Sequence, residues 1–182
     1  MVCKFVPLTT GDRPAIVRHL LHLGSDDRVL RFGTAAPDGA IVDYCGRWNF
    51  ARDIVEGVCE DGRIAGIIHL PVYEEGDDLV GELGVSVEAE SRQRHIATRL
   101  AVRTLERSRN RGLVRVYIHF LVRNRPMMRL AGRFTTDILL DRDEAQATIH
   151  LGASVPAPGF VVLPRPTGQL GCSLRPSRDQ GS

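Results

Sequence analysis

The sequence has no long apolar run, since none of its apolar stretches approaches the roughly 18 residues that a membrane-spanning helix needs. The stretch from Met1 to Pro7 also lacks a long apolar segment followed by a small-residue cleavage site, so we expect no secretion and no membrane partner. An excess of one charge sign is absent as well, because 24 Lys and Arg residues face 22 Asp and Glu residues and leave a net charge of +2. Such a balanced charge gives no reason to expect a nucleic-acid partner.

Cysteine is scarce and scattered. The four cysteines, Cys3, Cys45, Cys59 and Cys172, form no C-x-x-C pair and have no nearby histidine at the spacing of zinc ligands. We therefore expect reduced thiols, a cytoplasmic location and no metal site. What is present is ordinary for a soluble globular protein: 43% of the residues are hydrophobic and 25% are charged, which suffices for a core without disulfides.

The length of 182 residues fits one domain followed by a tail. Beyond Ser154 the composition shifts, and five prolines follow: Pro156, Pro158, Pro164, Pro166 and Pro176. We expect one domain over residues 1–163, with Phe160 to Leu163 docked as a short extended segment. For residues 164–182, rich in proline and glycine, we expect no packed structure.

Helical spacing of apolar residues predicts that the first fifty residues are helical. One helix follows Asp12 and ends near Gly24, a short one runs from Ser25 through Phe32, and a third follows Asp38. The period then changes to that of strands, with apolar runs at 53–60 and 63–73. The Asp-Gly pair at 61–62 between these runs predicts a hairpin.

The rest of the chain alternates between strands and helices. A turn at 75–78 leads into the expected elements, which are a strand at 79–88, a helix at 94–110, a strand at 113–122, a helix near Pro126 and a hairpin of 134–140 with 145–151. The strand at 79–88, the helix and the strand at 113–122 form a right-handed βαβ unit. The fold class is therefore α/β, or α+β, with a mixed and mostly antiparallel sheet flanked by helices.

The most informative stretch is the strand, loop and helix start between Gly81 and Thr98. Its loop and helix start carry Arg92, Arg94 and Arg99 beside the unpaired N–H groups of a helix N-terminus. Such an arrangement suits a phosphate or pyrophosphate group. On these residues alone, a solvated loop explains the pattern equally well.

This stretch also resembles a known family. The run Arg-Gln-Arg-His-Ile-Ala at 92–97 is similar to the acetyl-CoA signature Q/R-x-x-G-x-G/A of the GNAT N-acetyltransferase superfamily, and it lies between a strand and a long helix as in that family. The run from Asn124 to Phe134 resembles a later element of the same family. The resemblance covers roughly residues 4–151 and implies a GNAT-like sheet with a splayed central strand pair. His95 departs from the pattern because it replaces a glycine, whose missing Cβ permits a positive φ.

The resemblance assigns acetyl-CoA, as co-substrate, to this part of the chain. The pantetheine arm would lie in the splayed gap along the backbone of Val85, Ser86 and Val87, and a backbone N–H near Val85 could stabilise the thioester oxyanion. Asn124 would reach the cofactor from the neighbouring strand. The pyrophosphate would bind to the loop and helix start formed by Arg92, Gln93, Arg94, His95, Ile96, Ala97 and Thr98.

The resemblance also singles out Glu82 as the candidate general base, three residues before Val85 on the same expected strand. A surface carboxylate on a half-exposed strand is the alternative interpretation. The tyrosine that many relatives use as general acid has no counterpart at Leu130-Ala131, so the acid is unassigned. A thiolate can leave without an acid because the pKa of a thiol is about 8.5.

The implied activity is transfer of an acetyl group from acetyl-CoA to a primary amine, either a small molecule or a protein lysine, by direct attack on the thioester. The alternative is a catalytically weak or inactive acyl-CoA-binding module that acts as a sensor or interaction domain. The identity of the amine stays open, as does a homodimeric state. Acidic residues at 74–78 are compatible with a cationic substrate, but a polar hairpin explains them equally well.

Two further sets of residues have ordinary interpretations. An arginine recurs every four residues along the expected helix, and a solvated face is favoured over contact with nucleic acid or the 3′-phosphate of coenzyme A; the set is Arg99, Arg103, Arg107 and Arg111. Three histidines fall on expected strands, where we expect core or surface side chains without a function; they are His69, His119 and His150.

Overall fold

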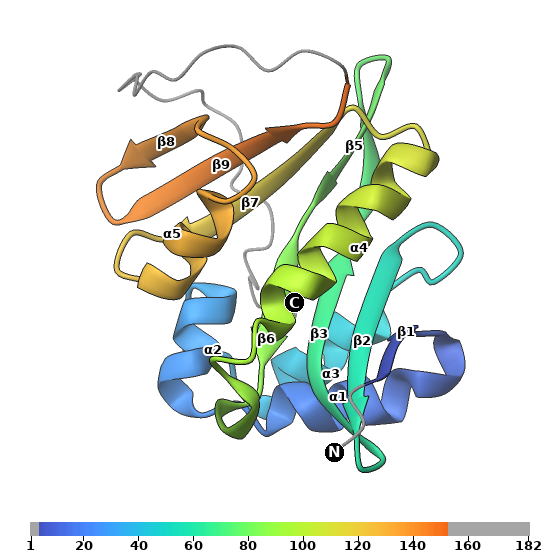
Figure 1. Ribbon diagram of the computed structural model, residues 1–182. Helices are drawn as coiled ribbons and strands as arrows, with labels where there is room; N and C mark the ends of the chain where they lie inside the picture. The colour runs from blue at the N-terminus through green and yellow to red at the C-terminus, as the bar shows by residue number, and fades with distance from the viewer. Residues whose placement is uncertain (1–3, 153–182) are drawn as a thin grey trace, which may run out of the picture.

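The computed structural model describes residues 4–152 of the chain. The expected boundary at residue 163, the docked segment at 160–163 and the tail at 164–182 lie outside the described residues. Within 4–152, no helix is both long and apolar enough to cross a membrane. Figure 1 shows helices on both sides of a twisted arrangement of strands.

The N-terminal part contains a strand that the sequence analysis missed. Strand β1, Lys4–Pro7, pairs antiparallel with β2. Its four residues are too few to show a period of two, so its pairing depends on the neighbouring strand. The three expected helices follow as α1 (Arg13–Leu21), α2 (Ser25–Phe32) and α3 (Asp38–Gly46), after a short 3-10 turn at Thr10–Asp12.

The predicted hairpin joins β2 (Ile54–Glu60) to β3 (Arg63–Leu70). Asp61 and Gly62 have φ angles of 47° and 79°, which is the left-handed conformation that a tight hairpin requires at both turn positions. The expected run at 63–73 is interrupted at Pro71, which has no N–H for a ladder bond, and β4 (Val72–Glu75) starts after it in a different sheet.

The expected single strand at 79–88 is wrong. The chain forms β5 (Asp78–Glu82) and β6 (Gly84–Val87), and the two strands belong to different sheets. The N–H of Leu83 still donates to the Tyr117 carbonyl on β7 at 2.8 Å, whereas Gly84 is already paired with His69 on β3. A continuous Val- and Leu-rich run does not reveal this change of partner, so Glu82 and Val85 lie on different strands.

Within residues 4–152, nine strands form two sheets. One has the order β1-β2-β3-β6, and the other has the order β4-β5-β7-β9-β8. The second sheet contains the C-terminal elements, which are β7 (Arg115–Leu121), β8 (Ile138–Asp141) and β9 (Glu144–His150), while α5 (Arg125–Ala131) follows β7. All the strand pairs among residues 4–152 are antiparallel except β5–β7, which are parallel and joined through α4 (Ile96–Asn110).

The core has two parts. Helix α4 packs on one face of the first sheet and buries Ile96, Leu100 and Leu105 in a cluster that extends into the second sheet. Helices α1 and α3 cover the opposite face of the first sheet with Ile16, Leu20 and other apolar side chains. Burial of a leucine or isoleucine side chain stabilises a fold by about 1.5–3 kcal/mol, so these two layers fix the positions of β6 and α4.

Candidate functional site

The site is built where β5 and β6 diverge. Strand β6 is an edge strand of its sheet, and within residues 4–152 its second side has no strand partner. Figure 1 shows β6 running away from β7, and a loop with a short 3-10 turn at Ala89–Ser91 connects β6 to the N-terminus of α4. The expected splayed strand pair is therefore confirmed, and it consists of β6 and β7.

The loop between β6 and α4 adopts the conformation that a glycine signature would give. His95 has φ 57° and ψ 17°, and Gln93 has φ 62°. A left-handed residue with a Cβ costs about 1–2 kcal/mol, so the histidine is held there at the expense of stability. The first main-chain bond of α4 runs from Arg99 N–H to the His95 carbonyl, and the amides of residues 96–98 therefore have no acceptor within the helix.

Both arginines of this loop are paired with carboxylates. Arg92 lies 2.6 Å from Asp27 of α2, and Arg94 lies 2.6 Å from Glu60 at the end of β2. The Ser91 hydroxyl also donates to Glu60, at 3.0 Å. These contacts fix the loop between α2 and β2, so the anion-binding groups that it presents are chiefly backbone amides.

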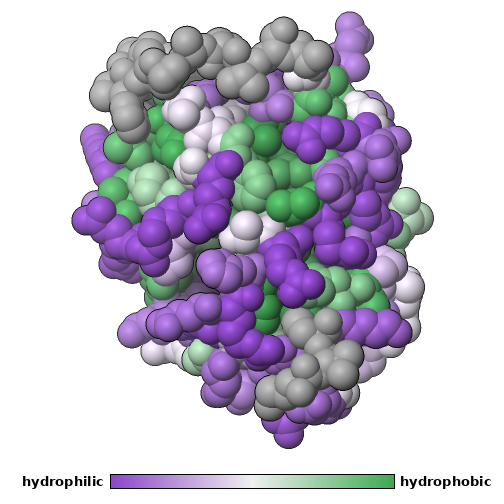
Figure 2. All heavy atoms as spheres, in the orientation of Figure 1, coloured by the Kyte–Doolittle hydropathy of each residue, from purple (hydrophilic) through white to green (hydrophobic). Residues whose placement is uncertain are grey.

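The arginines along α4 are engaged with the first sheet and with the residue before β2. Arg103 and Arg107 lie 3.3 and 2.5 Å from the carboxylate of Glu56, a fully buried side chain. Arg99 stacks over Phe5 at 4.1 Å, and Arg111 donates to the Asp53 carbonyl at 3.5 Å. Hydrophilic side chains cover much of the surface over α4 (Figure 2), and all four arginines are exposed. The stripe is therefore a solvated face whose contacts with Glu56, Phe5 and Asp53 also hold α4 against the first sheet.

Glu82 faces a histidine. Its Oε1 lies 3.3 Å from Nδ1 of His119, and both side chains are about one-fifth exposed, at 20% and 23%. On the other side, His119 Nε2 lies 3.1 Å from Oε1 of Gln146. Burial favours the neutral imidazole, but the Glu82 carboxylate and the Gln146 hydrogen bond outweigh it and raise the pKa of His119 above 6.5.

The sequence analysis did not assign a role to His119. The available signal was the alternation in β7, where Val116, Ile118 and Phe120 are buried and Tyr117 and His119 lie on the other face. Glu82 is directly opposite Tyr117 in the parallel ladder, and Tyr117 and His119 rings stack 6.4 Å apart. Without the pairing of β5 with β7, the alternation alone does not bring His119 to Glu82.

Two tyrosines lie on the same side of this sheet. The Tyr117 hydroxyl donates to Glu75 at 2.7 Å, and burial together with that bond raises its pKa to about 12. The pKa of Tyr73 is raised by burial and by the charges of Glu82 and Glu75. Arg115 pairs with both Glu75 and Asp78, which neutralises part of the acidic hairpin that suggested a cationic substrate.

A network of hydrogen-bonded polar side chains, most of them buried, approaches the gap between β6 and β7 from the side of α2 and α3. Asp53 lies 2.9 Å from His69 Nε2, and the Tyr44 hydroxyl lies 3.0 Å from His69 Nδ1 and accepts from Arg31 at 3.0 Å. Burial lowers the pKa of His69, which is therefore neutral, with Nε2–H donating to Asp53. This network links α2 and α3 to Gly84 of β6, because the Arg31 guanidinium covers that glycine.

Two of the expected cofactor residues have structural contacts. The Asn124 side chain, 6% exposed, accepts from Met127 N–H at 3.2 Å and caps α5, while its amide donates to the Leu30 carbonyl at 3.4 Å. The Ser86 hydroxyl lies 2.8 Å from Nε2 of the buried His19 on α1. Ser86 thus faces α1, where its hydroxyl is bonded to the buried histidine. Val85 and Val87 pack against the cluster that contains α4.

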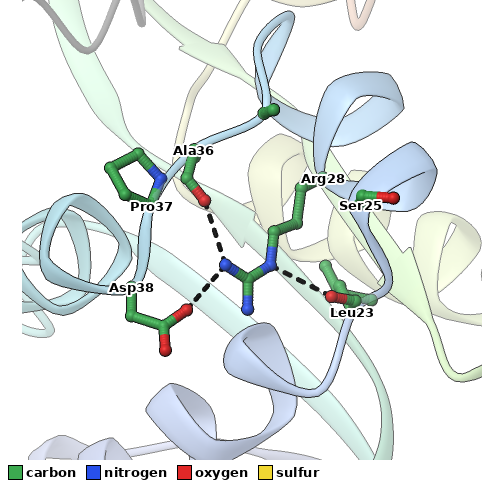
Figure 3. Close-up of a pocket in the computed structure, with 7 residues that line it drawn as sticks. Leu23, Ser25, Arg28, Ala36, Pro37 and Asp38 are labelled. Atoms are coloured by element: carbon green, nitrogen blue, oxygen red, sulfur yellow. Dashed lines mark hydrogen bonds and ion pairs between the residues drawn. The ribbon is translucent and has the colours of Figure 1, made fainter.

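A hollow of about 280 Å³ lies at the loops flanking α2 and is lined by Leu23, Ser25, Arg28, Ala35, Ala36, Pro37 and Asp38 (Figure 3). Arg28 lines one side of the hollow and donates hydrogen bonds to the carbonyls of Leu21, Leu23 and Ala36, and to the Asp38 carboxylate. None of the predicted cofactor residues lines this hollow. It is a junction between α1, α2 and α3, held by one arginine.

Cys45 and Cys59 are free thiols, and burial raises the pKa of Cys45 to about 11, so this thiol is inert. Within the described part of the chain, no group of three or more His, Cys, Asp or Glu side chains could hold a metal ion. Neither feature contributes to the site.

Comparison with known proteins gives one family. The model described as Acetyltransferase (GNAT) family matches residues 25–135, which is more than half of the chain. No curated protein matches the sequence significantly.

Solved structures share the fold at low sequence identity. The GNAT domain of S. lividans PAT is 14% identical with a TM-score of 0.68, over 81% of this chain and 90% of that one. Ribosomal-protein-S5-alanine acetyltransferase from Vibrio fischeri is 11% identical with a TM-score of 0.66, over 85% and 96% of the two chains. The structure of yncA from Salmonella typhimurium with its cofactor acetyl-CoA is 15% identical with a TM-score of 0.63, over 87% and 99%.

Proposed function

The chain belongs to the GNAT family of acetyltransferases, and from that premise we propose that it transfers the acetyl group of acetyl-CoA to a primary amine. The amine is a small molecule or a lysine side chain of a protein. One observation carries the proposal: the chain changes sheets at Leu83, so Glu82 lies just before the start of the open-edged strand β6, which leads through residues 88–95 to the N-terminus of α4. A base, a backbone edge and an anion-binding helix end are thus brought together.

The residues present fit acetyl-CoA. The edge of β6 at Val85, Ser86 and Val87 would bind the pantetheine arm through its backbone, as an added strand does. The amides from Gln93 to Thr98 would hold the pyrophosphate, because they lie in the left-handed loop before α4 and in the first turn of that helix. The structure of yncA contains acetyl-CoA on the same fold, which supports this placement.

Acetyl-CoA supplies an activated acyl group whose carbonyl carbon an amine can attack. In that reaction the new C–N bond forms, the C–S bond breaks, and the amine loses a proton. A backbone N–H of the β6 edge near Val85 would donate to the oxygen that gains charge. The leaving group is a thiolate, which needs no strong acid because the pKa of a thiol is about 8.5.

Glu82 would accept the amine proton. A lysine-like amine has a pKa of about 10.4, so at pH 7 roughly one molecule in 2,500 is neutral. Keeping it neutral costs about 4.6 kcal/mol, which a positioned base can help to supply. Glu82 is 20% exposed, so its carboxylate is accessible to a substrate at the splay.

Calorimetry with acetyl-CoA, followed by thiol detection with a panel of amines, tests the proposal. We expect heat of binding and release of a thiol that depends on one class of amine. Binding without thiol release from any amine would instead indicate an acyl-CoA-binding module without turnover. Absence of both would refute the proposed function.

A further inference from the structure

His119 is held between two polar groups on neighbouring strands. It projects from β7, with Glu82 of β5 on one side and Gln146 of β9 on the other, at 3.3 Å from Nδ1 and 3.1 Å from Nε2. Gln146 is directly opposite His119 in the antiparallel β7–β9 ladder. Three adjacent strands therefore determine where the imidazole lies.

Gln146 also fixes the tautomer of His119. The atom that faces Nε2 is the amide oxygen, and a carbonyl oxygen can only accept a hydrogen bond. Nε2 of the neutral ring therefore carries the proton, and Nδ1 presents a bare lone pair toward the Glu82 carboxylate. Two proton acceptors therefore face each other 3.3 Å apart, and one of them is the carboxylate proposed as the base.

Resting on the proposed function, we propose that Glu82 and His119 form one proton-accepting unit, in which Glu82 takes the amine proton and passes it to Nδ1 of His119. The N–H bond of the ammonium breaks, an O–H bond forms on Glu82 and breaks in turn, and an N–H bond forms on His119. The proton leaves to solvent after the acetylated amine departs. His119 does not touch the amine, so it is a positioning and proton-holding residue that acts through Glu82.

The surroundings of His119 suit this task. Glu82 and Glu144 are the charged groups that face it from β5 and β9, Gln146 is the neutral one, and Tyr117 stacks on it along β7. Burial alone would disfavour the imidazolium, but Glu82 and its neighbours raise the pKa of His119. An imidazole, with an ordinary pKa of about 6.5, holds a proton taken from an amine better than a carboxylate with a pKa of about 4 does.

The chain contains a second pair with the same spacing that serves as a control. His150 Nε2 lies 3.3 Å from Asp137, but this pair is roughly half exposed and lies at the opposite end of β9 from the site. A His–carboxylate pair that is only structural should behave in the same way at both places. The proposal requires that only the Glu82–His119 pair affects catalysis.

The pH dependence of kcat/KM for the purified full-length protein, with the best amine of the panel, distinguishes the two roles. In the wild type we expect activity to fall as the pH drops through the raised pKa of His119, because a protonated ring cannot take a second proton. His119→Gln should lower the maximal kcat/KM about 10- to 100-fold. It should also move the acid limb of the profile, where kcat/KM falls with decreasing pH, to lower pH by about one unit or more. His150→Gln should leave both unchanged.

A second variant should move the acid limb of the kcat/KM profile in the other direction. Gln146→Glu places a carboxylate beside Nε2, which should raise the pKa of His119 further and move the acid limb to higher pH. An active wild type whose His119→Gln variant is folded and keeps the wild-type profile would refute the role of His119 but not the proposed function. A wild type that neither binds acetyl-CoA nor releases thiol would refute the proposed function itself.

Nitrogen NMR of the imidazoles provides a readout that does not depend on activity. We expect His119 to be the Nε2–H tautomer at pH 8 and its pKa to fall in Glu82→Gln. A neutral ring protonated at Nδ1, or a pKa of His119 that does not respond to Glu82→Gln, would overturn the proposed unit. The NMR measurement also tests the Glu82–His119 unit if His119→Gln fails to fold.

Discussion

The guanidinium of Arg31 occupies the space that a side chain on Gly84 would need. A Cβ built on Gly84 would overlap three guanidinium atoms of Arg31. Tyr44 accepts a hydrogen bond from the same guanidinium, and the rings of Phe32 and Tyr44 lie 5.1 and 5.7 Å from it. The absence of a side chain at the first residue of β6 thus lets α2 and α3 contact the splay.

Gly84→Ala tests this contact. The added methyl group would force Arg31 out of its position between Tyr44 and the β6 backbone, and overpacking of this kind costs about 1–3 kcal/mol. We expect the free energy of unfolding in urea to fall by that amount. Gly39→Ala is the control, since a Cβ there meets nothing within 4 Å and alanine favours helix α3. Equal stability of Gly84→Ala and wild type would show that Arg31 relocates without cost.

Glu82→Gln keeps the size of the side chain and removes its basicity. We expect kcat to fall roughly 10²- to 10⁴-fold, the usual range for general base catalysis, with acetyl-CoA affinity nearly unchanged. The deficit should shrink as the pH rises, because the amine then deprotonates without help. Steady-state kinetics between pH 7 and 9 and calorimetry measure the two effects. Glu106→Gln, on the exposed side of α4, should alter neither. Full activity of Glu82→Gln at pH 7 would remove Glu82 as the base.

Asp27→Asn tests the link between α2 and the signature loop. Asp27 lies 2.6 Å from Arg92, and its negative charge is close to the amides that are proposed to bind a pyrophosphate. Removing that charge should tighten acetyl-CoA binding about two- to tenfold at low salt, with a smaller gain at high salt. Asp26→Asn, an exposed neighbour on the same helix turn, is the matched control for calorimetry. Weaker binding by Asp27→Asn alone would mean that the ion pair holds the loop in its binding conformation.

The two buried histidines His19 and His69 should make the fold sensitive to acid. Burial lowers the pKa of both below 6.5, so the unfolded chain takes up protons first when the pH falls below about 6.5. Their contribution to stability is fully present above that pH and is lost as the pH falls toward their folded pKa values. His119 has the opposite sign, because its raised pKa contributes stability that is lost as the pH rises above about 6.5.

We therefore expect the free energy of unfolding to be lower at pH 5.5 than at pH 7.5, and we expect His69→Gln to reduce this difference. His69 is 4% exposed and stacks on Trp48 at 3.8 Å, so the variant will also be less stable at both pH values. The test is therefore whether the free energies of unfolding at pH 5.5 and pH 7.5, measured in urea, differ less in His69→Gln than in the wild type. His150→Gln, which alters an exposed histidine, should leave the difference as it is in the wild type.

Local signals in the sequence predicted the elements on which the site is built. The Asp61-Gly62 turn, the helical spacing after Ile96 and the helix start near Pro126 each depend on neighbours a few residues apart, and each element is present. His95 departs from the signature at 92–97, in which a glycine permits a positive φ at this position, and it nevertheless adopts the left-handed backbone. Interactions within one turn or one hairpin are encoded in short stretches of residues, and this is why these features could be predicted.

The tertiary structure alone decided which strand edges meet. It divided the expected strand at 79–88 between two sheets, because Leu83 bonds to β7 whereas Gly84 pairs with β3. It placed His119 beside Glu82, since parallel pairing of β5 with β7 brings together residues that α4 separates in the chain. It also brought the arginines of α4 onto the buried Glu56, which no spacing in the helix could indicate. Such contacts depend on long-range packing of whole layers, so the sequence predicted the base and the binding loop but not the partners that set their chemistry.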